Sequence, residues 1–356
     1  MLRQLLSSLR QRPRAATTDE AVANARELLH ANEPRQVIEL LTPILDRHPN
    51  RLDARWLRGA AWLTLDDRAA ARVDLEYAVN HGNTDPLLPV YLAETYYKDG
   101  DVAKATAICH DALALGDSMG ARMLLATMQF GDDPYTNVLQ RIHRHLRPRT
   151  YIEIGVLTGD TLALCDPATI ALGVDPAPKL LHTLGPNQRV YRETSDDFFA
   201  AHDVRTELGG LPVDLAFIDG MHHFEYALRD FMHLEKISAP QSTVLVHDCY
   251  PLDAESASRE RSTDFWSGDI WRMIVLLKKV RPDLSISVVG TRPTGLGIIR
   301  NLNPASRVID DHLDALCAEY MALDYSSIAD CKPERLSLVP NDWERIKVLL
   351  DAPTRQ

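Results

Sequence analysis

The feature that most constrains the fold is a series of short apolar runs that alternates with helix-like stretches between residues 150 and 301. Two of these runs, 213–218 and 243–246, are almost continuously apolar, as in parallel strands that helices cover on both faces. Three more runs and four helical stretches complete the pattern, at 150–154, 170–174 and 189–192, and at about 159–165, 196–206, 224–237 and 268–280. The alternation predicts a doubly wound α/β sheet.

The last two runs of this region, 284–289 and 296–301, are separated by a connection too short for a crossover helix. They are therefore expected to form an antiparallel hairpin. A parallel Rossmann-like sheet that ends in an antiparallel hairpin resembles the class I S-adenosylmethionine-dependent methyltransferases. The resemblance implies an α/β methyltransferase domain over residues 147–302.

The N-terminal part shows a 34-residue period instead. Residues of similar kind recur at this spacing: Glu33, Asp67 and Asp101; Leu29, Leu63 and Tyr97; Val37, Ala71 and Ala105. Such a period predicts pairs of helices whose turn carries an acid able to cap the second helix. Residues 18–118 resemble tetratricopeptide repeats, which present a concave face to a peptide or another subunit. An ordinary helical bundle is the alternative fold, and a packing or dimerisation module without a ligand of its own is the alternative role.

Four regions follow from these patterns. A helix over 135–146 that ends before Pro148 places the boundary between the two domains near residue 147. The regions are a flexible leader (1–17), a tetratricopeptide-like helical domain (18–146), the methyltransferase-like domain (147–302) and a C-terminal helical extension (303–356). The extension is expected to hold helices near 307–322 and 342–350 and to pack on the repeats or on a second subunit.

Composition excludes several classes of protein. The net charge of -11 argues against nucleic acid as a partner. No apolar run approaches the ~18 residues that a membrane span needs. The five cysteines form no CxxC pair, which favours free thiols in a reducing cytoplasm over a zinc site or disulfides. The arginine-rich leader is expected to be solvated, with a transit peptide or a membrane-surface helix as alternatives.

A cofactor motif follows the first strand. Gly155 and Gly159 allow a tight turn and close approach of a ligand, and Asp175, at the end of the second strand, is placed to bind two ribose hydroxyls. The ExGxxxG pattern that begins at Glu153 differs from the GxGxxG of dehydrogenases and resembles the first motif of methyltransferases. Glu153 suits a cationic cofactor such as S-adenosylmethionine. The resemblance further implies that Asp196 or Asp197 contacts the adenine, although Ser195 and Asp196 could instead cap a helix.

Acids and imidazoles then follow two neighbouring strands. Asp219 and His222 come after the fourth strand, and His247 and Asp248 end the fifth, so all four are expected at the edge of the sheet where ligands bind. The DGxHxxxxxxxD pattern (Asp219, Gly220, His222, Asp230) followed by HD resembles small-molecule O-methyltransferases of the cephalosporin-pathway and macrolide-sugar type.

That resemblance implies roles. Asp219 and Asp248 would bind a divalent metal, His222 would be the general base, and His247 stands where magnesium-binding members carry Glu. Because imidazole replaces a hard oxygen ligand, magnesium, a softer metal and no metal at all stay open. The polar segment 251–267 is expected to be a substrate lid, and Trp266 and Trp271 either line an acceptor pocket or pack in the core.

The sequence as a whole predicts a cytoplasmic S-adenosylmethionine-dependent methyltransferase that acts on a hydroxyl oxygen of a small molecule, such as a sugar or natural product. The expected partners are that acceptor, a protein or peptide on the repeats, and a second copy of the chain. The alternatives are a protein methyltransferase, an interaction scaffold whose α/β domain is inactive, and a dehydrogenase.

Overall fold

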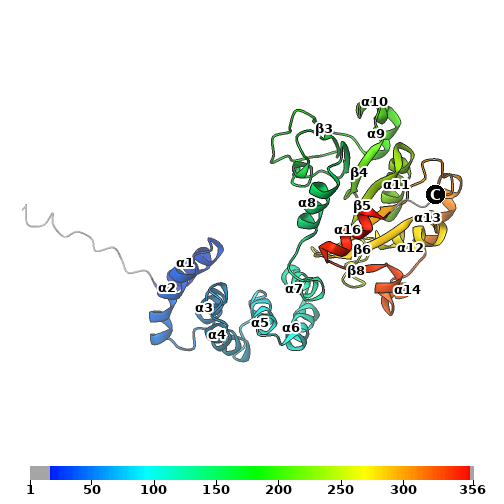
Figure 1. Ribbon diagram of the computed structural model, residues 1–356. Coiled ribbons are helices and arrows are strands. Elements are labelled where there is room, and N and C mark those ends of the chain that lie inside the picture. Colours follow the sequence, from blue (N-terminus) through cyan, green and yellow to red (C-terminus); the bar gives the residue numbers. More distant parts are fainter. Residues whose placement is uncertain (1–16, 353–356) are drawn as a thin grey trace, which may run out of the picture. The chain divides into compact units, whose positions relative to one another are not determined.

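The computed structural model describes residues 17–352 of the 356-residue chain (Figure 1). It divides into two compact units, and the boundary along the chain falls between Leu124 and Leu125. The predicted leader lies outside the described residues, apart from Thr17, whose side chain caps the first helix together with Glu20. Within residues 17–352, every helix is too short or too polar to cross a membrane.

The first unit is built from consecutive helices that pack against their neighbours in the chain. These are α1 (Thr18–His30), α2 (Pro34–Arg47), α3 (Leu52–Thr64), α4 (Arg68–Asn80), α5 (Leu88–Lys98) and α6 (Val102–Leu115). The turns within the pairs α1–α2, α3–α4 and α5–α6 share one backbone feature. Asn32, Asp66 and Gly100 adopt φ values of 58°, 60° and 86°, so a left-handed residue recurs at the spacing predicted from the sequence.

Two of the three predicted acidic caps are present. Asp67 accepts a hydrogen bond from the backbone of Ala70, and Asp101 accepts one from Lys104. The cap expected from Glu33 is absent, because its longer side chain bonds to the side chain of Gln36 instead.

The second unit begins within α7 (Met119–Phe130) and contains an eight-stranded sheet in the order β3-β2-β1-β4-β5-β7-β6-β8. The strands are β1 (Thr150–Ile154), β2 (Ile170–Val174), β3 (Gln188–Tyr191), β4 (Val213–Ile218), β5 (Ser238–His247), β6 (Ser285–Gly290), β7 (Leu296–Arg300) and β8 (Leu338–Pro340). Only β7 runs antiparallel to its neighbours. The predicted mixed sheet with its hairpin is therefore confirmed, and β8 is an addition that the sequence pattern did not indicate.

Helices cover both faces of this sheet. One core contains residues of α9 (Ser195–Ala201), α10 (Val204–Glu207), α11 (Phe224–Ile237), α12 (Trp271–Val280) and α13 (Leu313–Met321). The other contains residues of α8 (Tyr135–Leu146) and α16 (Trp343–Asp351). Neighbouring strand residues alternate between the two cores; Ile218 belongs to the first and Phe217 to the second. Because α8 packs on this sheet, the compact unit starts upstream of the boundary expected near residue 147.

Two expected helices differ in the structure. The stretch 159–165 forms only a 3-10 turn, Leu162–Leu164, since Cys165 is already extended and Pro167 follows soon after. The stretch 196–206 is divided into α9 and α10, because Asp203 caps a new helix by accepting a hydrogen bond from Thr206. The C-terminal extension also holds α14 (Ser326–Ala329) and α15 (Lys332–Arg335), and all its described elements lie in the second unit.

Candidate active site

The site lies where the strand order reverses between β1 and β4, at the carboxyl ends of the parallel strands. Gly155 makes this junction possible. A Cβ atom added there would lie 2.1 Å from the carbonyl oxygen of Asp219, and the residue has a φ of 87°. The Asp219 amide in turn donates to the carbonyl of Ile154 at 2.8 Å. A glycine at this point therefore holds the ends of two strands close together.

Asp175 lies beside the glycine-rich loop, as expected from its position after β2. One oxygen, Oδ2, accepts hydrogen bonds from the amides of Val156 at 3.0 Å and Leu157 at 2.8 Å. The other, Oδ1, accepts one from the amide of Ala177 at 2.7 Å. The carboxylate thus fixes the loop that Gly155 and Gly159 open, whose Gly159 also has a positive φ of 82°.

Glu153 is fully buried within the sheet below that loop. Its two oxygens accept hydrogen bonds from the hydroxyls of Tyr151 and Thr161, both at 2.7 Å. Burial raises the pKa of Glu153 to about 8, against the opposing effect of these two hydrogen bonds. The side chain therefore favours its neutral form near pH 7 and is held by donors that the sequence motif did not indicate.

The two acids expected at the adenine have partners within the protein. Asp196 forms a two-pronged ion pair with Arg229 of α11, at 3.0 and 2.8 Å. Asp197 accepts from the hydroxyl of Thr194 at 2.7 Å, and Thr194 is the residue that caps α9. The capping role considered for Ser195 and Asp196 was therefore wrong: the cap lies one residue before Ser195.

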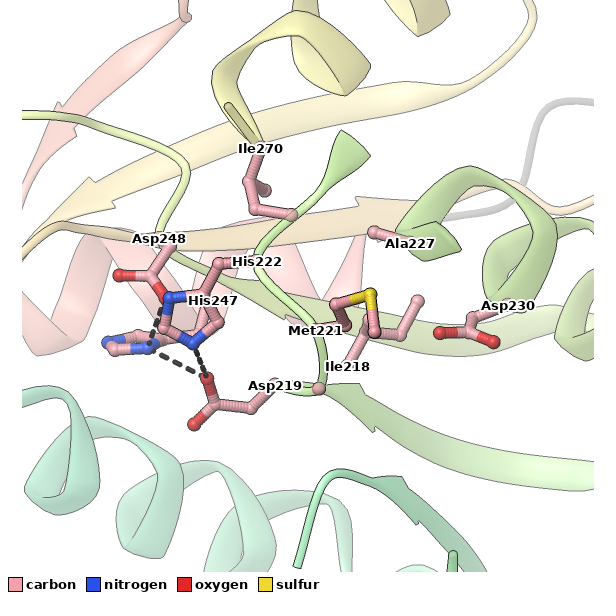
Figure 2. A pocket seen from close by; sticks show the side chains of 10 residues that line it. Ile218, Asp219, Met221, His222, Ala227, Asp230, His247, Asp248 and Ile270 are labelled. Atoms are coloured by element: carbon pink, nitrogen blue, oxygen red, sulfur yellow. Dashed lines mark hydrogen bonds and ion pairs between the residues drawn. The ribbon is translucent and has the colours of Figure 1, made fainter. Parts of the chain in front are cut away.

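The acids and imidazoles after β4 and β5 come together as predicted (Figure 2). Nδ1 of His247 lies 3.0 Å from Oδ1 of Asp219 and 3.4 Å from Oδ2 of Asp248. Asp219, His247 and Asp248 each offer one ligand atom, and these atoms lie within 4.8 Å of one another. His222 joins the cluster through Nδ1, 3.1 Å from Oδ2 of Asp248, while its Nε2 is 3.9 Å from Oδ1 of Asp219.

Charge in this cluster is strongly coupled. Burial lowers the pKa of His247, but the carboxylates of Asp248 and Asp219 outweigh it and raise that pKa well above its ordinary value. Burial would raise the pKa of Asp248, yet His222 and His247 hold it below its ordinary value. His247 is therefore expected to lie as a cation between two anions when no other cation is bound.

Several polar atoms of the cluster remain without a hydrogen bond. Among the described residues, Nε2 of His247 and Oδ2 of Asp248 are buried and have no partner of hydrogen-bond geometry. A small pocket adjoins them, and Asp230 lines it as well. In Figure 2, Asp230 lies apart from the cluster, beyond Met221 and Ile218. Buried polar atoms without partners are rare in native proteins, so this edge of the sheet is suited to a ligand.

The segment expected to be a lid packs against the start of α11. Within this segment, Arg259 pairs with Glu225 of α11. Just after the segment, the fully buried Asp269 accepts a hydrogen bond from the amide of Phe224 at 2.8 Å, and its own amide donates to the carbonyl of His222 at 3.1 Å. The ring of Trp266 stacks on His222, with 5.1 Å between centroids and 18° between planes. Trp271 is 1% exposed and belongs to the core.

Sequence reasoning missed two residues that contact the cluster. The hydroxyl of Thr294 donates to Oδ1 of Asp248 at 2.5 Å, from the loop between β6 and β7. Tyr135, the first residue of α8, lies over His247, with 3.9 Å between ring centroids. The position of Thr294 in the loop of the predicted hairpin could have indicated its contact with the site. No sequence pattern indicated Tyr135, because it precedes the first strand and reaches the site only through the packing of α8.

Comparisons with known proteins place one known domain within the second unit. Residues 152–249 match the family model described as a methyltransferase domain. No curated protein sequence matches the chain.

Solved structures resemble the chain only distantly. An O-methyltransferase from Bacillus cereus in complex with S-adenosylhomocysteine is 17% identical, with a TM-score of 0.36 over 46% of this chain and 79% of that one. The O-methyltransferase TomG from Streptomyces achromogenes, in complex with S-adenosylmethionine, is 17% identical, with a TM-score of 0.35 over 48% and 80%. A methyltransferase from Podospora anserina with bound S-adenosylhomocysteine is 12% identical, with a TM-score of 0.37 over 48% and 78%.

The family match covers the glycine-rich loop, Asp175, Asp219, His222, His247 and Asp248. The enzyme class predicted from the sequence is confirmed: the second unit carries an S-adenosylmethionine-dependent methyltransferase domain.

Proposed function

We propose that this domain transfers a methyl group from S-adenosylmethionine to a hydroxyl oxygen of a small molecule, such as a sugar or natural product. The observation that carries the proposal is the cluster of Asp219, His222, His247 and Asp248, with its unpartnered buried atoms at the carboxyl edge of β4 and β5. An alcohol must lose its proton as the new bond forms, and this cluster contains both a candidate base and a candidate cation site.

The residues present suit a divalent metal. Two carboxylates and an imidazole form a mixed oxygen and nitrogen donor set, which favours manganese, iron or zinc over magnesium. When bound, such an ion polarises the acceptor hydroxyl and orients it. Because protonated His247 lies between the same two carboxylates, metal binding requires that imidazole to lose its proton.

His222 is proposed as the general base. Its Nδ1 is directed to Asp248, which leaves Nε2 available for the acceptor. The hydroxyl oxygen attacks the methyl carbon in line with the carbon–sulfur bond, and the bonding electrons of that bond remain on sulfur as the neutral thioether. The hydroxyl proton passes to Nε2 of His222, while the charge of Asp248 stabilises the imidazolium that forms.

The cofactor would lie over the glycine-rich loop. Asp175 can bind the ribose hydroxyls while it keeps its loop hydrogen bonds, since each carboxylate oxygen has two lone pairs. Glu153, held by Tyr151 and Thr161, is proposed to favour the cationic end of the cofactor, whose positive charge would stabilise the ionised form of this buried acid. Of the two acids expected at the adenine, Asp197 is the better candidate, because Asp196 is paired with Arg229.

The first unit is proposed to be a tetratricopeptide-like solenoid that binds a peptide or another subunit. Support comes from the recurrence of left-handed Asn32, Asp66 and Gly100 in equivalent turns, together with the caps of Asp67 and Asp101. Since a peptide held on such a repeat could also be methylated, a protein acceptor is the second candidate function.

Calorimetric titration with S-adenosylmethionine, S-adenosylhomocysteine and NAD tests the cofactor first, with Asp175→Ala as the control. The sulfur nucleosides should bind in the micromolar range and NAD should not, and the variant should lose binding. Radiolabelled methyl transfer to pooled hydroxyl compounds and to peptides, with and without manganese, then tests the acceptor. Label in peptides alone would replace the small-molecule proposal, and folded protein that binds neither nucleoside would leave an inactive scaffold.

A further inference from the structure

Tyr135 is held over the active site by the hairpin loop between β6 and β7. Its amide donates to the carbonyl of Arg292 at 3.0 Å. The residues just before it are also fixed: the side chain of Arg292 donates to the carbonyl of Asp132 at 2.8 Å, and the hydroxyl of Thr291 donates to the backbone carbonyl of Asp133 at 2.6 Å. The same loop provides Thr294, which binds Asp248. The start of α8 and the metal-binding cluster are thus fixed to one loop.

The side chain of Tyr135 touches two members of the cluster. Its ring lies 3.9 Å from that of His247, at an interplanar angle of 31°. Its hydroxyl donates to Oδ2 of Asp219 at 3.4 Å, a long hydrogen bond of the kind that often shortens when a site is loaded.

We propose that Tyr135 is a positioning residue for the metal ligands Asp219 and His247, an inference that rests on the proposed metal site. The hydroxyl holds Oδ2 of Asp219, which leaves Oδ1 directed toward Nδ1 of His247 and the third ligand, Asp248. The ring covers one face of His247 and limits the rotation of its imidazole. Partners of this kind orient metal ligands and raise affinity without contacting the ion.

A packing role alone predicts different behaviour. The next turn of α8 is anchored by Val138, Leu139 and Ile142, all fully buried, so the helix does not depend on Tyr135 for its place on the sheet. If Tyr135 only filled space, Tyr135→Phe would change nothing, because phenylalanine keeps the ring. A positioning role requires the hydroxyl, and the conservative variant should then weaken metal binding while the fold stays intact.

Titration of the full chain with Mn²⁺, followed by calorimetry and by the loss of the free-ion paramagnetic resonance signal, tests the inference. Tyr135→Phe should weaken Mn²⁺ about 10-fold with an unchanged Tm and unchanged S-adenosylhomocysteine affinity. Tyr135→Leu should weaken it further, because the cover over His247 is lost as well. The matched control is Tyr77→Phe, which removes a tyrosine hydroxyl that bonds to Asn50 at 2.6 Å in the first unit and should leave Mn²⁺ affinity unchanged.

The outcomes separate the two proposals. Equal Mn²⁺ affinity in wild type and Tyr135→Phe would overturn the positioning role and leave the metal site standing. Wild-type protein that binds S-adenosylhomocysteine but no Mn²⁺ would overturn the metal site, and the role of Tyr135 with it.

Discussion

Two buried clusters of charge, one in each unit, differ in how completely their atoms are paired. In the first unit, Asp74 is 1% exposed and its oxygens accept from Arg55 at 2.9 Å and from Arg58 at 2.7 and 3.0 Å. In the second unit, the two acids Asp219 and Asp248 share imidazoles, and Nε2 of His247 has no hydrogen bond to any described residue.

The difference separates a structural cluster from a functional one. Around Asp74, one acid accepts hydrogen bonds from two guanidinium groups on both of its oxygens, so the buried carboxylate needs no outside partner. Around His247, buried polar atoms remain without a hydrogen bond, which a ligand could satisfy. Buried polar atoms that lack partners raise the free energy of the folded state and persist where function requires them.

Asp248→Asn should give the largest effect on activity. It removes a proposed metal ligand and the group that orients His222, so methyl transfer should fall on the order of 10³-fold and Mn²⁺ binding should be lost. Stability should fall only modestly, because the attraction of His222 and His247 that lowers the pKa of Asp248 is lost. Steady-state kinetics with an identified acceptor, together with thermal unfolding, provides the check; a large fall in Tm would mean that the cluster is structural.

Asp74→Ala should have the opposite effects: a large loss of stability and no change in cofactor binding. Removing one partner of a buried ion pair costs about 3–5 kcal/mol, here because Arg55 and Arg58 lose their shared acid. Urea unfolding of the full chain should show this loss, whereas S-adenosylhomocysteine affinity should remain that of wild type. The contrast between the clusters would fail if this variant left stability unchanged.

Gly155→Ala should weaken the cofactor site through the backbone. The added Cβ would meet the carbonyl of Asp219 at 2.1 Å, and the positive φ alone costs about 1–3 kcal/mol. Calorimetry should show S-adenosylhomocysteine affinity at least ~10-fold lower. Gly116→Ala is the matched control, since its Cβ would meet nothing within 4 Å. An equal loss of S-adenosylhomocysteine affinity in both variants would mean that the close contact between Gly155 and Asp219 is not the cause.

Glu153→Gln should change the pH dependence of stability rather than activity alone. The folded-state pKa of Glu153 is raised to about 8 from an ordinary 4.5. The folded protein therefore holds a proton that the unfolded chain releases, and this contribution to stability declines as pH rises from about 4.5 to 8. Tm of wild type should fall more steeply over this range than that of the variant, whose amide does not ionise. Parallel curves would mean that Glu153 is ionised throughout.

Much of the second unit could be predicted because its strands are local patterns. The run 213–218 coincides with β4, and Asp219, His222, His247 and Asp248 meet because two parallel strands end at the same edge. Their convergence needed only the period of the strands and the rule that ligands bind at that edge.

The remaining features depend on contacts distant in sequence. Tyr135 reaches His247 across more than a hundred residues, and Asn341 of the C-terminal extension bonds to Asp133 at 3.0 Å just before α8. None of these contacts has a periodic signature.

The most direct measurement is a crystal structure of the full chain with S-adenosylhomocysteine and Mn²⁺, with anomalous data collected at the manganese edge. We expect one strong anomalous peak with Asp219, His247 and Asp248 as its ligands, and His222 free to face the acceptor. A structure with S-adenosylhomocysteine in place, no manganese peak there, and His247 still between the two carboxylates would contradict it.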